Sequence, residues 1–120
     1  MRIAEAAARC GLSIDTIRYY EKSMLLPAIE RGSDGKRRFS NENVEWLTLL
    51  SSLRDTGMTM ERMRYFARLY QDGANTLAER QRILLEHSIY LEKQRFTLDK
   101  CAKLLSYKLK RYEELLGDSE

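Results

Sequence analysis

The sequence contains one proline, six glycines and two cysteines in 120 residues. Because proline and glycine are the main interruptions of helices, so few of them favour a helix-rich protein. Cys10 and Cys101 cannot form a disulfide framework, so we expect two reduced thiols. No stretch reaches the apolar length of a membrane span, and the first ten residues lack the uncharged apolar core of a signal peptide. We therefore expect a cytoplasmic protein.

Charged residues make up 32% of the chain, but the formal net charge is only +3. This mild excess does not by itself indicate a nucleic-acid partner. The local distribution is more informative, because Arg31, Lys36, Arg37 and Arg38 fall close together. The sequence offers no nucleophile–base pair, no metal-ligand cluster around its single histidine, His87, and no glycine-rich phosphate loop. We expect neither an enzyme nor a bound cofactor or metal.

The first 22 residues have the pattern of a helix-turn-helix. Residues 3–10 are alanine-rich, and Gly11 stands where a helix commonly ends. Ser13 is then placed to cap a second helix over residues 14–22, with Asp15 in its first turn. In such motifs the second helix enters the major groove of DNA.

A β-hairpin is predicted over residues 28–39, because the Ser-Asp-Gly turn accepts the backbone conformations of a tight hairpin. The cluster of cations falls on this hairpin. Ser40 then caps a helix whose apolar residues recur at helical spacing up to Gly57, and Thr59 caps another that ends at Gly73. The first 73 residues therefore form a predicted winged helix-turn-helix domain.

The spacing of the second helix separates an inner from an outer face. Ile17 and Tyr20 fall together and are expected to pack inward, while Arg18 and Tyr19 face outward. Arginine can contact guanine edges or phosphate, and hydroxyl groups can bond phosphate oxygens. The hairpin cations would follow the flanking backbone. The predicted DNA-binding residues are Ser13, Thr16, Arg18, Tyr19, Lys36, Arg37 and Arg38.

Residues 74–120 are predicted to form a long dimerisation helix and a short tail. A leucine recurs every seventh residue from Leu77 to Leu105, and Tyr112 continues the series, which is typical of a coiled coil. The other seam positions are polar in the first half and apolar in the second. An antiparallel pair sets each weak half against a strong half, so we expect antiparallel pairing. The predicted dimer contacts are Leu84, Leu91, Leu98, Leu105, Leu109 and Tyr112.

Three segments together resemble the MerR family of bacterial transcription regulators. They read GLSIDTIRYYEKSMLLP, DGKRRFS and LLSSLRDTGMTMERM. The resemblance implies that Arg18 and Tyr19 contact DNA and that Arg37 is the wing arginine. It also implies a homodimer that binds promoter DNA in the bacterial nucleoid. On effector binding, such a dimer would distort a long promoter spacer and so act on RNA polymerase indirectly, through the DNA.

The chain departs from the family pattern at three positions. Lys36 replaces a usual wing tyrosine, Met24 replaces a glycine at the exit of the second helix, and Phe39 lacks the hydroxyl of a wing tyrosine. We therefore expect Phe39 to pack rather than contact phosphate. We also expect Met24 to alter the helix exit.

Two questions stay open at the level of sequence. Cys101 lies near Lys100 and Lys103, which could lower its pKa and make it a redox or electrophile sensor. The other reading is a small residue that flanks the helix seam. A coiled-coil scaffold whose basic hairpin is only solvated is the alternative to a DNA-binding regulator.

Overall fold

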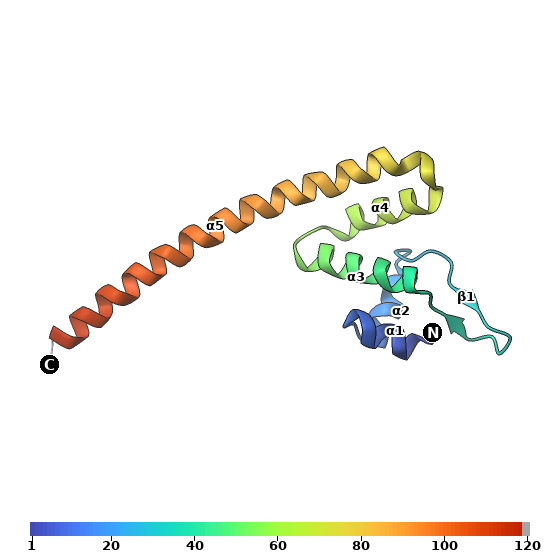
Figure 1. Ribbon diagram of the computed structural model, residues 1–120, viewed down its shortest axis with the longest axis horizontal. Helices are drawn as coiled ribbons and strands as arrows, with labels where there is room; N and C mark the ends of the chain where they lie inside the picture. Colours follow the sequence, from blue (N-terminus) through green and yellow to red (C-terminus); the bar gives the residue numbers. More distant parts are fainter. Residues whose placement is uncertain (119–120) are drawn as a thin grey trace. The chain divides into compact units, whose positions relative to one another are not determined.

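The computed structural model describes residues 1–118 (Figure 1). In chain order its elements are α1 (Ile3–Cys10), α2 (Ile14–Lys22), β1 (Glu30–Arg31), β2 (Arg37–Arg38), α3 (Asn41–Asp55), α4 (Met60–Asp72), the 3-10 turn η1 (Ala74–Thr76) and α5 (Leu77–Asp118). The mainly α fold class, with a helix-turn-helix, a hairpin wing and a long final helix, is confirmed. In this range no helix has both the length and the apolar character needed to cross a membrane.

Contacts divide the chain into two compact units, Met1–Ile83 and the residues from Leu84 onward. The first turns of α5 belong to the first unit, where Ile83 is fully buried. α5 begins at Leu77, two residues later than a helix from Asn75 would, because η1 precedes it. The boundary proposed at residue 73 follows the glycine in the sequence and stays a prediction.

The core of the first unit lies where α1 packs on α2 and α3, and α3 packs on α4. Trp46 is buried near its centre and stacks on Tyr70 and Phe66, with ring centroids 4.3 Å and 5.4 Å away. The Trp46 indole N–H donates to the carbonyl oxygen of Leu25 at 2.8 Å. This bond ties α3 to the segment that links α2 with the wing.

The predicted caps begin three of the helices. The hydroxyls of Ser13, Ser40 and Thr59 each accept the backbone N–H three residues ahead, which satisfies a donor that has no partner inside the helix. The Ser40 backbone N–H also donates to the side-chain oxygen of Asn43 at 2.9 Å, which completes a capping box. The sequence therefore fixed where α2, α3 and α4 begin.

Three helices end in the same left-handed turn. After α1, α2 and α3, a backbone N–H reaches back five residues, from Leu12 to Ala7, from Leu25 to Tyr20 and from Met58 to Leu53. The left-handed residue is glycine in two of these turns, Gly11 at φ 70° and Gly57 at φ 102°. In the turn after α2 it is Met24, at φ 63°. Met24 thus takes the left-handed conformation that glycine has in the other two turns.

Replacing Met24 with glycine should raise the free energy of unfolding by about 0.5–1 kcal/mol, because glycine adopts the left-handed conformation without a Cβ clash. Met24 is 76% exposed, so little packing is lost. Urea unfolding followed by circular dichroism measures the change. Ala28→Gly is the matched control, since Ala28 is also exposed but has no positive φ, and it should not stabilise. An equal change in the free energy of unfolding of the two variants would show that Met24 is not strained.

Candidate nucleic-acid interface

The cap at Ser13 and the buried side chains orient α2 as the spacing of its apolar residues predicts. The Ser13 hydroxyl accepts the Thr16 N–H at 3.0 Å and bonds the Thr16 hydroxyl at 2.8 Å. Ile17 and Tyr20 are each 1% exposed, so the predicted inward face is confirmed. Tyr19, in contrast, is 48% exposed and lies on the open side of the helix. The helix therefore presents a polar outer surface that is fixed by its buried residues.

Arg18 is the cation at the centre of that outer surface. Its side chain is 64% exposed, and its ion pair with Asp15 has a nitrogen–oxygen distance of 4.0 Å. Asp15 is itself 96% exposed, so water screens this pair and it contributes little. The guanidinium of Arg18 is therefore available to an external acceptor.

Arg54, near the end of α3, lies against the two tyrosines of α2. Its guanidinium carbon is 5.9 Å from the centre of the Tyr19 ring and 5.8 Å from that of Tyr20. Its Nη1 also donates to the Tyr20 hydroxyl at 3.5 Å, and this bond raises the pKa of Arg54 above its usual value. The sequence reasoning missed Arg54, because no local spacing shows that the end of α3 reaches Tyr19.

The wing is a short antiparallel hairpin in which Glu30 pairs with Arg38 and Arg31 with Arg37. The N–H of Gly32 donates to the carbonyl oxygen of Lys36 at 2.8 Å and closes the turn. Gly35 has φ 77°, a conformation that favours glycine. The predicted hairpin is confirmed, with strands shorter than the predicted span.

Asp34 organises the tip of the wing. Its carboxylate accepts the Lys36 backbone N–H at 3.0 Å, and it pairs with Arg2 at 3.1 Å and Arg38 at 3.4 Å. The backbone bond from Lys36, followed by the charges of Arg38 and Arg2, lowers the pKa of Asp34 below its usual value. Arg38, a predicted DNA contact, is therefore already engaged at the tip.

At the base of the wing Arg37 pairs with Glu21 of α2. The Arg37 Nε donates to Glu21 Oε2 at 2.8 Å, and Nη2 donates to Oε1 at 2.5 Å. Both side chains are about one-third exposed, at 33% and 32%. The bonds to Glu21 raise the pKa of Arg37 above its usual value. Arg37 thus joins the wing to the helix with both nitrogens of one edge of its guanidinium.

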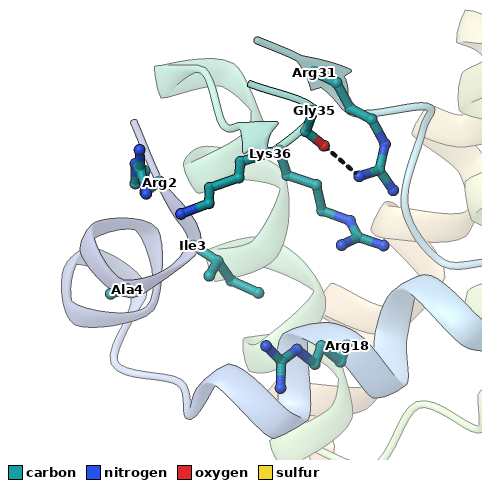
Figure 2. Close-up of a pocket in the computed structure, with 8 residues that line it drawn as sticks. Arg2, Ile3, Ala4, Arg18, Arg31, Gly35 and Lys36 are labelled. Carbon is teal, nitrogen blue, oxygen red and sulfur yellow. Dashed lines mark hydrogen bonds between the residues drawn. The ribbon is translucent and has the colours of Figure 1, made fainter. Parts of the chain in front are cut away.

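A cavity of about 450 Å³ opens between the wing, the start of α1 and the outer face of α2 (Figure 2). Its polar lining is cationic, and Ile3 and Ala4 supply apolar surface. The lining cations are Arg2, Arg18, Arg31, Lys36 and Arg37. We call this space the wing cavity. Such a concentration of positive charge beside an exposed helix suits a polyanionic partner.

The structure brings together part of the predicted set. Arg18, Lys36 and Arg37 line the wing cavity, and Tyr19 lines an adjoining cavity together with Arg18 and Arg37. Ser13, Thr16 and Arg38 line neither cavity. Within residues 1–118 the Lys36 side chain has no ion-pair partner, so its charge is free. Phe39 is 2% exposed, which confirms the expectation that it packs.

Sequence reasoning also missed that Arg2 reaches the wing cavity. Arg2 lies 32 residues from its partner Asp34, so their contact exists only in the folded chain. The Glu21 carboxylate likewise pairs with Arg37, 16 residues away in the sequence. Neither contact has a signal in the local sequence.

The predicted dimer residues divide by exposure. Leu84 and Leu91 are half-buried, whereas Leu98, Leu105, Leu109 and Tyr112 are all exposed, with Leu98 at 68%. Exposed apolar residues in a row at these spacings are typical of a helix that pairs with another chain. Cys101, on the same stretch, is also exposed.

In the described part of the chain no group of histidine, cysteine or acidic side chains is arranged to hold a metal ion. His87 stacks on Tyr90, with ring centroids 5.7 Å apart. On α4, Phe66 is buried in the core and the Tyr70 hydroxyl donates to Glu42 at 2.7 Å. Packing therefore accounts for these two aromatic residues.

Comparison with known proteins identifies the family. The model of the family described as MerR HTH family regulatory protein matches residues 1–68. An uncharacterized HTH-type transcriptional regulator from Haemophilus influenzae is 35% identical over 92% of this chain and 82% of its own length. The chain belongs to the MerR family. It is therefore a DNA-binding transcription regulator and not an enzyme.

Two further comparisons show how far the similarity extends. The HTH-type transcriptional regulator AdhR of Bacillus subtilis is 31% identical over 72% of this chain, which spans 61% of AdhR. The crystal structure of HiNmlR, a MerR family regulator lacking the sensor domain, was determined bound to promoter DNA. It matches 94% of this chain and 90% of its own with 34% identity and a TM-score of 0.86. The similarity thus reaches beyond the DNA-binding unit into α5.

Proposed function

We propose that this MerR protein is a homodimer that binds a specific promoter sequence, with α2 in the major groove and the wing on the flanking backbone. The observation that carries the proposal is the wing cavity, where Arg18 of α2 and the unpaired Lys36 of the wing face one space. Arginine on an exposed helix can read guanine, while the wing cations neutralise phosphates and fix the register. Similarity to HiNmlR, which was solved on promoter DNA, supports the same partner.

The dimer would form through α5. Leu98, Leu105, Leu109 and Tyr112 leave a long apolar row exposed, and a second copy would cover it. An antiparallel pair would set the polar first half of each seam against the apolar second half of its partner. Two copies of α2 would then face two half-sites of a near-palindromic operator.

The dimer would activate transcription by changing DNA shape. An operator between the two promoter elements lets a bound dimer bend and undertwist a long spacer, and so realign the elements for RNA polymerase. An effector would act by favouring one dimer geometry over another. Cys101 is the candidate sensor thiol, and a Cys101→Ser variant that keeps a normal response to oxidant and aldehyde in a promoter reporter would remove it.

Selection from a pool of random duplexes with the full-length protein tests specific binding. Enrichment of one near-palindromic sequence, with an affinity that falls steeply as salt rises, is the expected result. Footprinting on the chromosome should then protect a site between two promoter elements. A coiled-coil scaffold would enrich no sequence, and that outcome would reject the proposal.

Arg54 is proposed as a further phosphate contact, because it lies beside Tyr19 on the DNA-facing side of the domain. Arg54→Ala should weaken binding to all duplexes alike and reduce the slope of log affinity against log salt by about 0.9. Fluorescence anisotropy at several salt concentrations measures both effects. Arg82→Ala is the control, since it removes an equally charged side chain that pairs with Glu79 on α5. Matching slopes in the two variants would count against a role for Arg54.

A further inference from the structure

Glu21 is an acidic side chain between the outer face of α2 and the wing, the two surfaces that we propose contact DNA. It borders the cavity that Arg18 and Tyr19 line, on the same helix. A carboxylate so close to a phosphate backbone weakens binding by repulsion. A favourable contribution of Glu21 to binding would have to offset this repulsion.

The ion pair with Arg37 can supply that contribution. Glu21 occupies Nε and Nη2, the two nitrogens on one edge of the guanidinium, so the geometry is fixed by two bonds. The pair is about two-thirds shielded from solvent, whereas Arg18 and Asp15 are 64% and 96% exposed. Solvent therefore screens Arg37–Glu21 less than it screens Arg18–Asp15.

We infer that Glu21 is a positioning residue, which holds Arg37 and thereby sets the angle of the wing to α2. Arg37 acts mainly as the link between the two elements, and Lys36 next to it carries the phosphate contact. Asp34 pairs with Arg2 at the tip of the hairpin, and Met1 and Phe39 exchange two backbone hydrogen bonds of 2.6 Å where the wing ends. The Arg37–Glu21 pair is the contact that joins the wing to α2. The inference rests on the proposed function and deepens it, since it says which wing cation binds DNA.

Substitution of Glu21 by glutamine separates the two effects by sign. If the carboxylate only repels DNA, Glu21→Gln should tighten binding to every duplex. If it positions the wing, Glu21→Gln should weaken binding to the duplex enriched by the wild-type protein about tenfold, the size expected for a coupled pair. Binding to an unrelated duplex of equal length should stay the same or become tighter.

Substitutions of Arg37 provide the second readout. Arg37→Lys keeps the charge but cannot form the two parallel bonds, so it should behave like Arg37→Ala on the enriched duplex. The double variant Glu21→Gln/Arg37→Ala should bind no more weakly than Arg37→Ala alone. Lys36→Ala is the control, and it should weaken both duplexes alike and lower the salt slope by about 0.9.

The inference would be overturned if Glu21→Gln bound the enriched duplex at least as tightly as the wild type, if Arg37→Lys bound it as the wild type does, or if the losses in the double variant were additive. Equal loss on both duplexes would also overturn it. Enrichment of no sequence by the wild type would reject the proposed function instead. If the proposed function is rejected in this way, hydrogen exchange of the free protein still tests whether Glu21 positions the wing. Glu21→Gln should speed exchange of the Gly32 amide while the amides of α3 stay protected. Unchanged exchange of the Gly32 amide would refute a positioning role.

Discussion

Arg18→Ala should weaken binding to the enriched duplex by about 10- to 100-fold, the range expected for loss of a bidentate arginine contact with a base. Arg18 lines both cavities on the outer face of α2, and its ion pair with the exposed carboxylate of Asp15 is long, at 4.0 Å. Discrimination between the enriched duplex and single-base variants should also fall at one position of each half-site. Fluorescence anisotropy with a panel of duplexes measures both quantities.

Two control variants show what causes the loss of affinity in Arg18→Ala. Arg18→Lys keeps a charge for phosphate but cannot bond a guanine bidentately, so it should restore affinity for all duplexes more than discrimination. Asp15→Ala removes the screened partner and should leave specific binding unweakened. Since Arg18 is exposed, thermal unfolding of all three variants should match the wild type. Wild-type discrimination in Arg18→Ala would show that α2 does not read the bases through this residue.

Leu98→Asp should convert the proposed dimer into monomers. Burial of a leucine side chain contributes about 1.5–3 kcal/mol, and a dimer loses two of them, so the dissociation constant should rise at least about 100-fold. Leu98 is 68% exposed in the single chain, so the first unit should keep its fold. Sedimentation velocity over a range of concentrations measures the change, and circular dichroism should show that α5 loses helix as its partner is lost.

Lys100→Asp is the matched control for Leu98→Asp, since it places the same side chain on α5 two residues away and off the seam. This control should remain a dimer. Monomers in both variants would mean that added acid, rather than the lost seam contact, disrupts pairing. A Leu98→Asp protein that sediments as a dimer would contradict the coiled-coil proposal.

Much of the fold could be predicted because its signals are local. Ser13, Ser40 and Thr59 cap helices through bonds that span three residues, and Gly11 and Gly57 end helices through their own backbone conformation. The buried face of α2 also follows from spacing alone, as Ile17 and Tyr20 show. Such patterns need no knowledge of the rest of the chain.

The candidate site was predicted only in part, because its charges are sorted by contacts between distant segments. Arg18 and Lys36 could be identified as outward cations from their motif and position. That Arg37 is held by Glu21 and Arg38 by Asp34 depends on how the wing folds back on α2 and on its own tip. A row of similar cations in the sequence does not show which of them is already paired.

The sequence by itself determined the helices, the hairpin, the inward face of α2 and the family, because capping, spacing and turn residues act over a few positions. Tertiary structure decided which charges remain available. It placed Arg2 and Arg54, which lie far from α2 in the sequence, beside the predicted site, and it gave Glu21 a partner 16 residues away. Pairing of charges depends on distance in space, and only the packed chain fixes that distance.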